Sequence, residues 1–293
     1  MRGMSPAIRL VADVKAVLGE GPVWVGRDAS LYWVDIKGRR LFRLDDAGLS
    51  EWITPVRVGS IAPRAAGGFV TGTEDGFQLL EIDGERLRFS LLGNPETDLP
   101  DNRFNDGKVD RAGRFWAGTM DDREKTSLGA LYRLDAQRCV VKLDEGYAVT
   151  NGPAFSPSGD VMYHTDSARR TIYRFALAPD GSLGSRETFL HFTGAEGYPD
   201  GMTVDADGCL WVAFWDGWAV RRFSLAGELL ATIEVPVQRP TSVAFGGPSL
   251  DRLYITSARI GLDEPALSMQ PSAGGLLMLK PGVVGIAERP FAG

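Results

Sequence analysis

A unit of short strands recurs six times along the chain, and this repeat limits the possible folds more than any other feature. Each unit opens with a small turn and an apolar strand, then runs through a Gly or Asp turn into an aromatic-rich strand and a third strand. The first positions of the units align at 20, 60, 106, 151, 200 and 241, which are 40 to 49 residues apart. Four strands and about 40–50 residues per repeat are typical of β-propeller blades. The sequence therefore predicts an all-β, six-bladed propeller with four-stranded blades.

The two ends of the repeat pattern indicate how the ring closes. A fourth strand follows the third in five units, but the sixth unit lacks one, and the segment AIRLVADV at 7–14 belongs to no unit. We expect this N-terminal strand to complete the sixth blade, because closure removes exposed strand edges. A doubly wound α/β fold would need helices of ~10–15 residues between the strands, and the sequence shows no such pattern. We therefore expect one domain over residues 1–293.

Composition and charge argue against several classes of protein. The net charge of -6 lacks the excess of Lys and Arg that neutralises nucleic-acid phosphates. The start, MRGMSPAIRL, has no apolar stretch of signal-peptide length, and no apolar run reaches the ~18 residues of a membrane span. Two distant cysteines predict neither a disulfide framework nor a zinc motif. We expect a cytoplasmic protein that binds neither nucleic acid nor membrane, and the oligomeric state is left open.

The repeat also predicts where a functional site lies. The first strand of each propeller blade lines the central channel, so residues at the same repeat position converge around the axis. All six aligned residues carry a side-chain oxygen: Glu20, Ser60, Asp106, Asn151, Asp200 and Thr241. They can be read as turn residues, because Asp-Gly and Asn-Gly are common turn pairs. Carboxylates crowded in a channel would repel one another without a cation, however, and this favours a metal site.

The residue types restrict the chemistry of such a site. Hard oxygen ligands suit Ca²⁺, Mg²⁺ or Mn²⁺, Fe(II) stays open, and the lack of Cys and His in the set argues against a structural zinc site. The two histidines, His164 and His191, are interpreted as packing or surface residues. With no G-x-S-x-G elbow, a serine triad is not supported.

Four segments resemble the gluconolactonase family, which includes regucalcin (senescence marker protein) and bacterial sugar lactonases. They are LGEGPVW at 18–24, RFNDGKVDRAGRFWAGTM at 103–120, TNGPAFSPSG at 150–159 and YPDGMTVDADGCLWVA at 198–213. The segments follow the family's order and extend over nearly the whole chain. The resemblance implies a six-bladed propeller that hydrolyses a lactone, a carboxylic ester, with the help of one divalent metal ion.

The resemblance also implies roles for individual residues. Glu20, Asn151 and Asp200 would hold the ion, and Arg103 and Asn105 would hydrogen-bond the substrate. Asp106 would lie near the ion without necessarily binding it. The ion's identity stays open among Ca²⁺, Mg²⁺, Mn²⁺, Zn²⁺ and Fe(II). Arg103 could instead simply pair with Asp101 or Asp106, and Asn105 has a similar structural alternative.

The predicted reaction is attack of water on a lactone carbonyl, followed by ring opening to the hydroxy acid. Asp200 is the candidate general base, and the alternative is hydroxide generated on the ion itself. Aldonolactones such as glucono-, xylono- or arabinono-lactone are the leading substrates. The insertions at 119–129 and 257–273 are expected to wall the pocket.

Three other functions compete with lactone hydrolysis. They are a non-catalytic calcium-binding propeller, a hydrolase of organophosphates or aryl esters, and a protein-interaction propeller.

Overall fold

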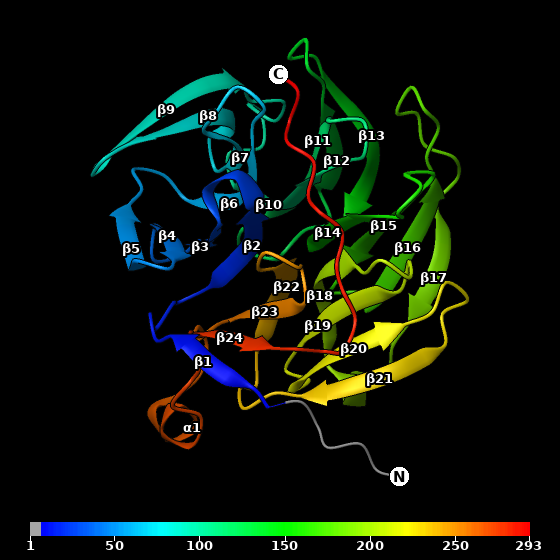
Figure 1. Ribbon diagram of the computed structural model, residues 1–293. Helices are drawn as coiled ribbons and strands as arrows, with labels where there is room; N and C mark the ends of the chain where they lie inside the picture. Colours follow the sequence, from blue (N-terminus) through cyan, green and yellow to red (C-terminus); the bar gives the residue numbers. More distant parts are fainter. Residues whose placement is uncertain (1–6) are drawn as a thin grey trace.

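Six four-stranded antiparallel sheets are arranged in a ring around a central channel (Figure 1). The computed structural model describes residues 7–293. The prediction that the N-terminal segment is no signal peptide concerns residues 1–10, and the first six of these lie outside the described range. The fold is the predicted six-bladed propeller. Among the described residues, no helix is long and apolar enough to cross a membrane.

Within every blade the strands follow one another outward from the channel. The first strands are β2 (Gly19–Val25), β6 (Val58–Pro63), β10 (Asn102–Val109), β14 (Thr150–Phe155), β18 (Tyr198–Val204) and β22 (Pro240–Gly246). The second strands are β3 (Ser30–Asp35), β7 (Phe69–Thr73), β11 (Phe115–Asp121), β15 (Val161–Asp166), β19 (Leu210–Trp215) and β23 (Arg252–Ser257). Neighbouring first strands contact one another, so they form the wall of the channel.

The outer half of each blade is more exposed. The third strands are β4 (Arg40–Asp45), β8 (Gly76–Asp83), β12 (Gly129–Leu134), β16 (Thr171–Ala176), β20 (Ala219–Phe223) and β24 (Leu276–Leu279). The fourth strands are β5 (Gly48–Ile53), β9 (Arg86–Gly93), β13 (Val140–Tyr147), β17 (Glu187–His191), β21 (Leu229–Glu234) and β1 (Arg9–Ala12). The second strands are buried on both faces because a neighbouring blade covers each face, whereas the fourth strands alternate toward solvent.

The N-terminal strand closes the ring, as predicted. β1 pairs antiparallel with β24, with Arg9 opposite Met278, and the sixth blade has the order β22, β23, β24, β1. Figure 1 shows β1 in blue beside β24 in red. This pairing covers the outer edge of β24, which would otherwise present unpaired backbone groups.

The apolar core is divided among the six interfaces between blades. The cluster between blades 1 and 2, for example, joins Val34 and Trp52 to Phe69 and Leu80. A corresponding cluster fills each of the other interfaces, including the one between blades 6 and 1. Every blade therefore contributes to two clusters, and the ring holds the first strands at fixed positions around the axis.

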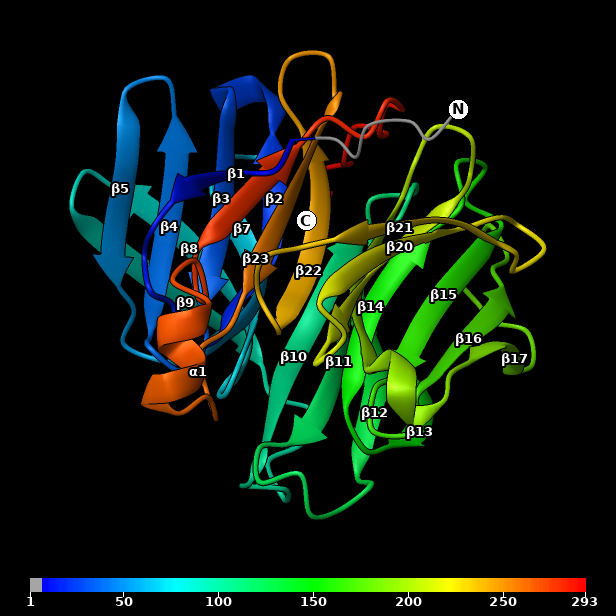
Figure 2. The same ribbon diagram turned by 90° about the horizontal axis from the view of Figure 1, so that it is seen from below.

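The two faces of the ring differ. The C-terminal segment crosses one face, bridging from Asp205 after β18 to Arg64 after β6 on the far side of the axis (Figure 1). The helix α1 (Glu264–Met269), in the connection between β23 and β24, projects from the opposite face (Figure 2). One end of the channel is thus covered by the chain terminus, and the other is surrounded by connections between strands.

Candidate functional site

A β-bulge interrupts each first strand at the same repeat position. In all six blades the pairing between first and second strands shifts register there. The aligned residues lie at or inside these shifts: Glu20, Ser60, Asp106, Asn151, Asp200 and Thr241. A bulge bends a strand and redirects its side chains, and bulges are frequent beside active sites. The interpretation of these residues as ordinary turn residues is therefore wrong.

A glycine follows four of the aligned residues, whereas Ile61 and Ser242 stand at this position in the other two blades. Gly21 and Gly152 have φ of +55° and +73°, a backbone conformation that residues with a side chain rarely adopt. Gly201 has a steric reason instead, because a Cβ atom there would lie 2.2 Å from Ser242 Oγ on the next blade. At these three positions a larger residue would meet either an unfavourable backbone conformation or a clash with the next blade.

A cavity of about 550 Å³ opens at one end of the channel. Five of the predicted site residues line it together: Glu20, Arg103, Asn105, Asn151 and Asp200. The two long connections also contribute to its wall, through Glu124 and Ile260. The expectation that these insertions wall the pocket is confirmed, and residues far apart in the sequence share one concave site.

Hydrogen bonds fix the amides and the arginine of this cavity. Asn151 Nδ2 donates to Ser167 Oγ at 2.9 Å, which orients the amide. Asn105 Nδ2 donates to Asn151 Oδ1 at 3.1 Å and to the carbonyl oxygen of Thr150 at 2.7 Å. Arg103 Nη1 donates to Asn105 Oδ1 at 2.6 Å. The side chains are therefore held in place before any ligand arrives.

Three buried carboxylates repel one another at the centre of the ring. Burial, and then the charges of Asp200 and Asp106, raise the pKa of Glu20 well above its usual value. Burial and the charge of Asp106 do the same to the pKa of Asp200, and burial raises the pKa of Asp106 to about 6. Each of the three side chains is at most 8% exposed. A cation placed among them would relieve both the repulsion and the desolvation.

The donor set fits a divalent cation with a preference for oxygen. Glu20 and Asp200 supply carboxylate oxygens, and the anchored Asn151 amide supplies a neutral one, which is the ligand chemistry of Ca²⁺, Mg²⁺ and Mn²⁺. Within residues 7–293, no group of three or more His, Cys, Asp and Glu side chains is placed to hold a metal. A site in this cavity therefore depends on the amide oxygen as its third protein ligand.

The other aligned residues lie away from the cavity. Ser60 and Thr241 are fully buried, and Thr241 Oγ1 donates to the carbonyl oxygen of Gly19 at 2.5 Å. Asp106 accepts hydrogen bonds from Gly107 N at 2.8 Å and Gly152 N at 3.1 Å, and it borders a small void deeper in the channel. The repeat alignment thus brings six oxygen-bearing residues to the axis, and only three of them reach the cavity.

Sequence reasoning missed Lys37, which lines the cavity, and the aspartate that holds it. Asp122, in the connection after β11, accepts hydrogen bonds from Lys37 Nζ at 2.6 Å and Arg103 Nε at 2.5 Å. Arg103 does pair with a nearby aspartate, but that residue is Asp122. Lys37 and Asp122 are 85 residues apart, and neither belongs to the repeat pattern, so no sequence signal joined them.

Neither histidine takes part in the site. His164, on β15 of blade 4, is fully buried against Tyr147 of blade 3, and burial lowers the pKa of His164 to about 3. His191 lies on the outer strand β17, where Nδ1 is 3.0 Å from Thr171 Oγ1. Both positions agree with the predicted packing and surface roles.

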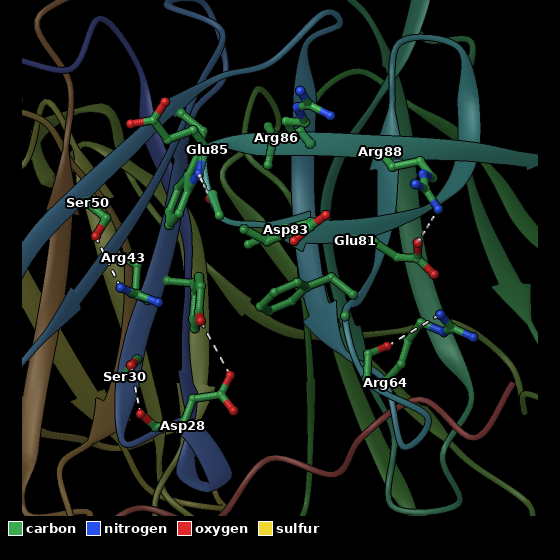
Figure 3. A pocket seen from close by; sticks show the side chains of 18 of the residues that line it. Asp28, Ser30, Arg43, Ser50, Arg64, Glu81, Asp83, Glu85, Arg86 and Arg88 are labelled. Atoms are coloured by element: carbon green, nitrogen blue, oxygen red, sulfur yellow. Dashed lines mark hydrogen bonds and ion pairs between the residues drawn. The ribbon is translucent and has the colours of Figure 1, made fainter.

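A larger hollow of about 1660 Å³ lies between blades 1 and 2, away from the axis (Figure 3). Among its charged side chains, Glu81 pairs with Arg88 at 3.5 Å and Arg43 pairs with Asp45 at 3.1 Å. None of the aligned polar residues lines it. The smaller axial cavity brings carboxylates, amides and an arginine together, and it is therefore the better candidate site.

Fold and site together define a six-bladed propeller with a polar, oxygen-rich cavity on its axis. Residues 18–259 match the model of the "SMP-30/Gluconolactonase/LRE-like region" family. The chain belongs to this family.

Relatives and solved structures resemble the chain over nearly its whole length. The 6-deoxy-6-sulfogluconolactonase of Pseudomonas putida is 40% identical over 99% of this chain and 100% of its own. The L-arabinolactonase of Azospirillum brasilense is 35% identical over 97% of this chain and 95% of its own. The crystal structure of a calcium-binding protein, regucalcin, from Agrobacterium tumefaciens superposes with a TM-score of 0.92 at 32% identity, covering 98% of this chain and 97% of its own.

The buried carboxylates predict an unusual pH dependence of stability without metal. An acid whose pKa is raised by folding stabilises the fold fully below its unfolded pKa, and that contribution is lost as the pH rises through the folded pKa. For Asp106 this window runs from 3.8 to about 6, worth about 3 kcal/mol. We expect the Tm in EDTA to fall as the pH rises from 4 to 7, and Ca²⁺ to reduce this fall. Parallel Tm profiles with EDTA and with Ca²⁺ would contradict the prediction.

Proposed function

We propose that the chain hydrolyses a sugar lactone in the axial cavity, with one divalent cation held by Glu20, Asn151 and Asp200. The observation that carries the proposal is the meeting of two buried carboxylates and an anchored amide oxygen in a cavity large enough for a sugar. The lactonases among the relatives support the reaction class. We further infer that residues 1–293 act as one domain and that the protein is cytoplasmic.

A bound cation would act as a Lewis acid toward the lactone carbonyl, and three protein ligands would leave positions open for substrate and water. Asp106 would stay outside the ligand set, because its two oxygens already accept backbone hydrogen bonds from Gly107 and Gly152. Its charge would still favour a cation at the axis. The identity of the ion is open among Ca²⁺, Mg²⁺, Mn²⁺, Zn²⁺ and Fe(II).

Asp200 is the proposed general base. Burial and the nearby Asp106 raise its pKa in the metal-free site, and a bound cation would lower that pKa again. Asp200 would therefore act as base through its place in the cavity and not through unusual basicity. It would accept a proton from the attacking water as the new C–O bond forms at the carbonyl carbon. The ring C–O bond then breaks, and the departing alkoxide takes up the proton to give the hydroxy acid.

Arg103 and Asn105 are the proposed substrate-binding residues. Their mutual hydrogen bond and the contact of Asn105 with Asn151 hold both beside the proposed ligands. Donors and acceptors fixed in this way suit the hydroxyl groups of an aldonolactone, because binding then costs little side-chain ordering. Glucono-, xylono- and arabinono-lactone and sulfonated gluconolactone are the substrates to test first.

Metal removal and restoration test the proposed reaction. We expect the EDTA-treated, dialysed protein to lose acid release from aldonolactones, measured against the spontaneous rate, and one or more of the candidate ions to restore it. Paraoxon and phenyl acetate serve as controls for the esterase alternative. If the protein binds Ca²⁺ tightly but hydrolyses no lactone with any ion, it is a calcium-binding propeller and the proposal is wrong.

The variant Asp200→Ala tests whether Asp200 acts as general base and as metal ligand. We expect kcat/KM for the preferred lactone to fall at least a thousandfold, because the variant removes a ligand and the base together. Asp207→Ala, which changes an exposed aspartate of the same blade, should retain wild-type activity. Turnover by Asp200→Ala equal to wild type would exclude a catalytic role for this residue.

A further inference from the structure

Basic side chains outnumber carboxylates on one side of the axial cavity. Besides Lys37 and Arg103, Arg57 pairs with Asp122, and its Nε also lies 2.5 Å from Glu74 Oε2. Arg39 is the fourth cation of the group, with Nη2 3.3 Å from Glu74. The group, which we call the basic wall, consists of Lys37, Arg39, Arg57, Arg103, Glu74 and Asp122. Its four positive and two negative charges leave a net charge of +2, and Glu124, which lines the cavity from the same connection as Asp122, reduces the surplus on this side to +1.

Lys37 is the member of the basic wall with hydrogen-bonding capacity left for a ligand. Only Lys37 and Arg103 of the basic wall line the cavity. The Arg103 side chain is 4% exposed and is held by Asp122, Asn105 and the Phe104 carbonyl oxygen. The ammonium of Lys37 has three donors, and among the described residues its one hydrogen-bond partner is Asp122. The Lys37 side chain is 24% exposed, so its remaining donors can reach a bound molecule.

The side of the cavity lined by Arg239 has no surplus of positive charge. Arg239 lines it from blade 6, but its Nε donates to Asp216 Oδ1 at 2.6 Å and its Nη1 donates to the carbonyl oxygen of Ile260. Its guanidinium also stacks 4.7 Å above the Trp215 ring. Because this arginine is matched by one carboxylate, the excess positive charge is confined to the Lys37 side.

A chain of hydrogen bonds relates Lys37 to the proposed reaction centre. It runs from Asn151 through Asn105 and Arg103 to Asp122, and then to Lys37. Lys37 is thus the last residue of a chain of hydrogen bonds that begins at Asn151, a proposed metal ligand. Lys37 and the proposed ligands line the same cavity, so a lactone with its carbonyl at the axis can extend the far end of its sugar chain toward Lys37.

We propose that the preferred substrate is a sugar lactone with an anionic oxygen group, a sulfonate or a phosphate, at the end remote from the lactone carbonyl, and that Lys37 binds that group. The inference rests on the proposed lactonase function. Hydrogen bonds between an ammonium and an anion are about twice as strong as neutral ones. A neutral hydroxyl in the same place would leave the surplus positive charge of the basic wall without a counterion.

Matched lactones test this specificity. The probes are glucono-1,5-lactone, which is neutral, and its 6-deoxy-6-sulfo and 6-phospho counterparts, assayed with the restoring ion and corrected for spontaneous hydrolysis. We expect at least a tenfold higher kcat/KM for one of the anionic lactones than for the neutral one. The sulfo and phospho arms show which anion the cavity accepts. The preference should decrease with added salt, because screening weakens charge pairing.

Lys37→Met removes the charge and keeps most of the side-chain volume. We expect it to lower the anionic-to-neutral ratio of kcat/KM at least tenfold, mainly through KM for the anionic lactone, and Lys37→Arg to retain part of the preference. Asp122 keeps Arg57 and Arg103 as partners, so the wall should stay folded, which circular dichroism can check. Lys280→Met, at an exposed pair with Asp251, is the control and should leave the ratio unchanged.

The outcomes separate this inference from the proposed function. Equal kcat/KM for neutral and anionic lactones, or an unchanged ratio in Lys37→Met, would overturn the inference and leave lactone hydrolysis standing. If no aldonolactone, neutral or anionic, is hydrolysed with any ion, both proposals are contradicted. If only neutral pentonolactones are hydrolysed, the inference about the anionic group is overturned and lactone hydrolysis stands.

Discussion

The repulsion among Glu20, Asp106 and Asp200 is the constraint on which the site depends. Each carboxylate is buried, and the ring holds the three in place because neighbouring blades fill every interface around them. The fold cannot relax this arrangement without opening the core between blades. The carboxylates must therefore either keep protons to an unusually high pH or share a cation, and the second solution supplies an electrophile where a lactone would bind.

The architecture was predictable because it repeats. Strands with a period of 40 to 49 residues and an unassigned strand at 7–14 predict six blades and their closure. The six four-stranded sheets confirm the first prediction, and the pairing of β1 with β24 confirms the second. The alignment of Glu20, Asn151 and Asp200 was equally informative, because equivalent positions in a propeller converge by symmetry. What the alignment did not reveal is that these positions are bulges and that Ser60 and Thr241 are buried away from the cavity.

The features that break the repeat could not be predicted from the sequence. Lys37 and Asp122 come from connections in different blades, and their pairing depends on how those connections lie over the cavity. The C-terminal segment that crosses the ring has no counterpart in the other repeats. Function in this propeller combines both kinds of feature: symmetric positions provide the proposed reaction centre, and individual connections provide the groups that surround it.

A crystallographic map from the protein soaked with Mn²⁺, recorded near the manganese absorption edge, tests the central claim most directly. We predict one anomalous peak on the axis, within direct coordination distance of Glu20, Asn151 and Asp200 side-chain oxygens. An axis without a peak, or a manganese ion bound elsewhere while these three side chains bind only water, would contradict the account.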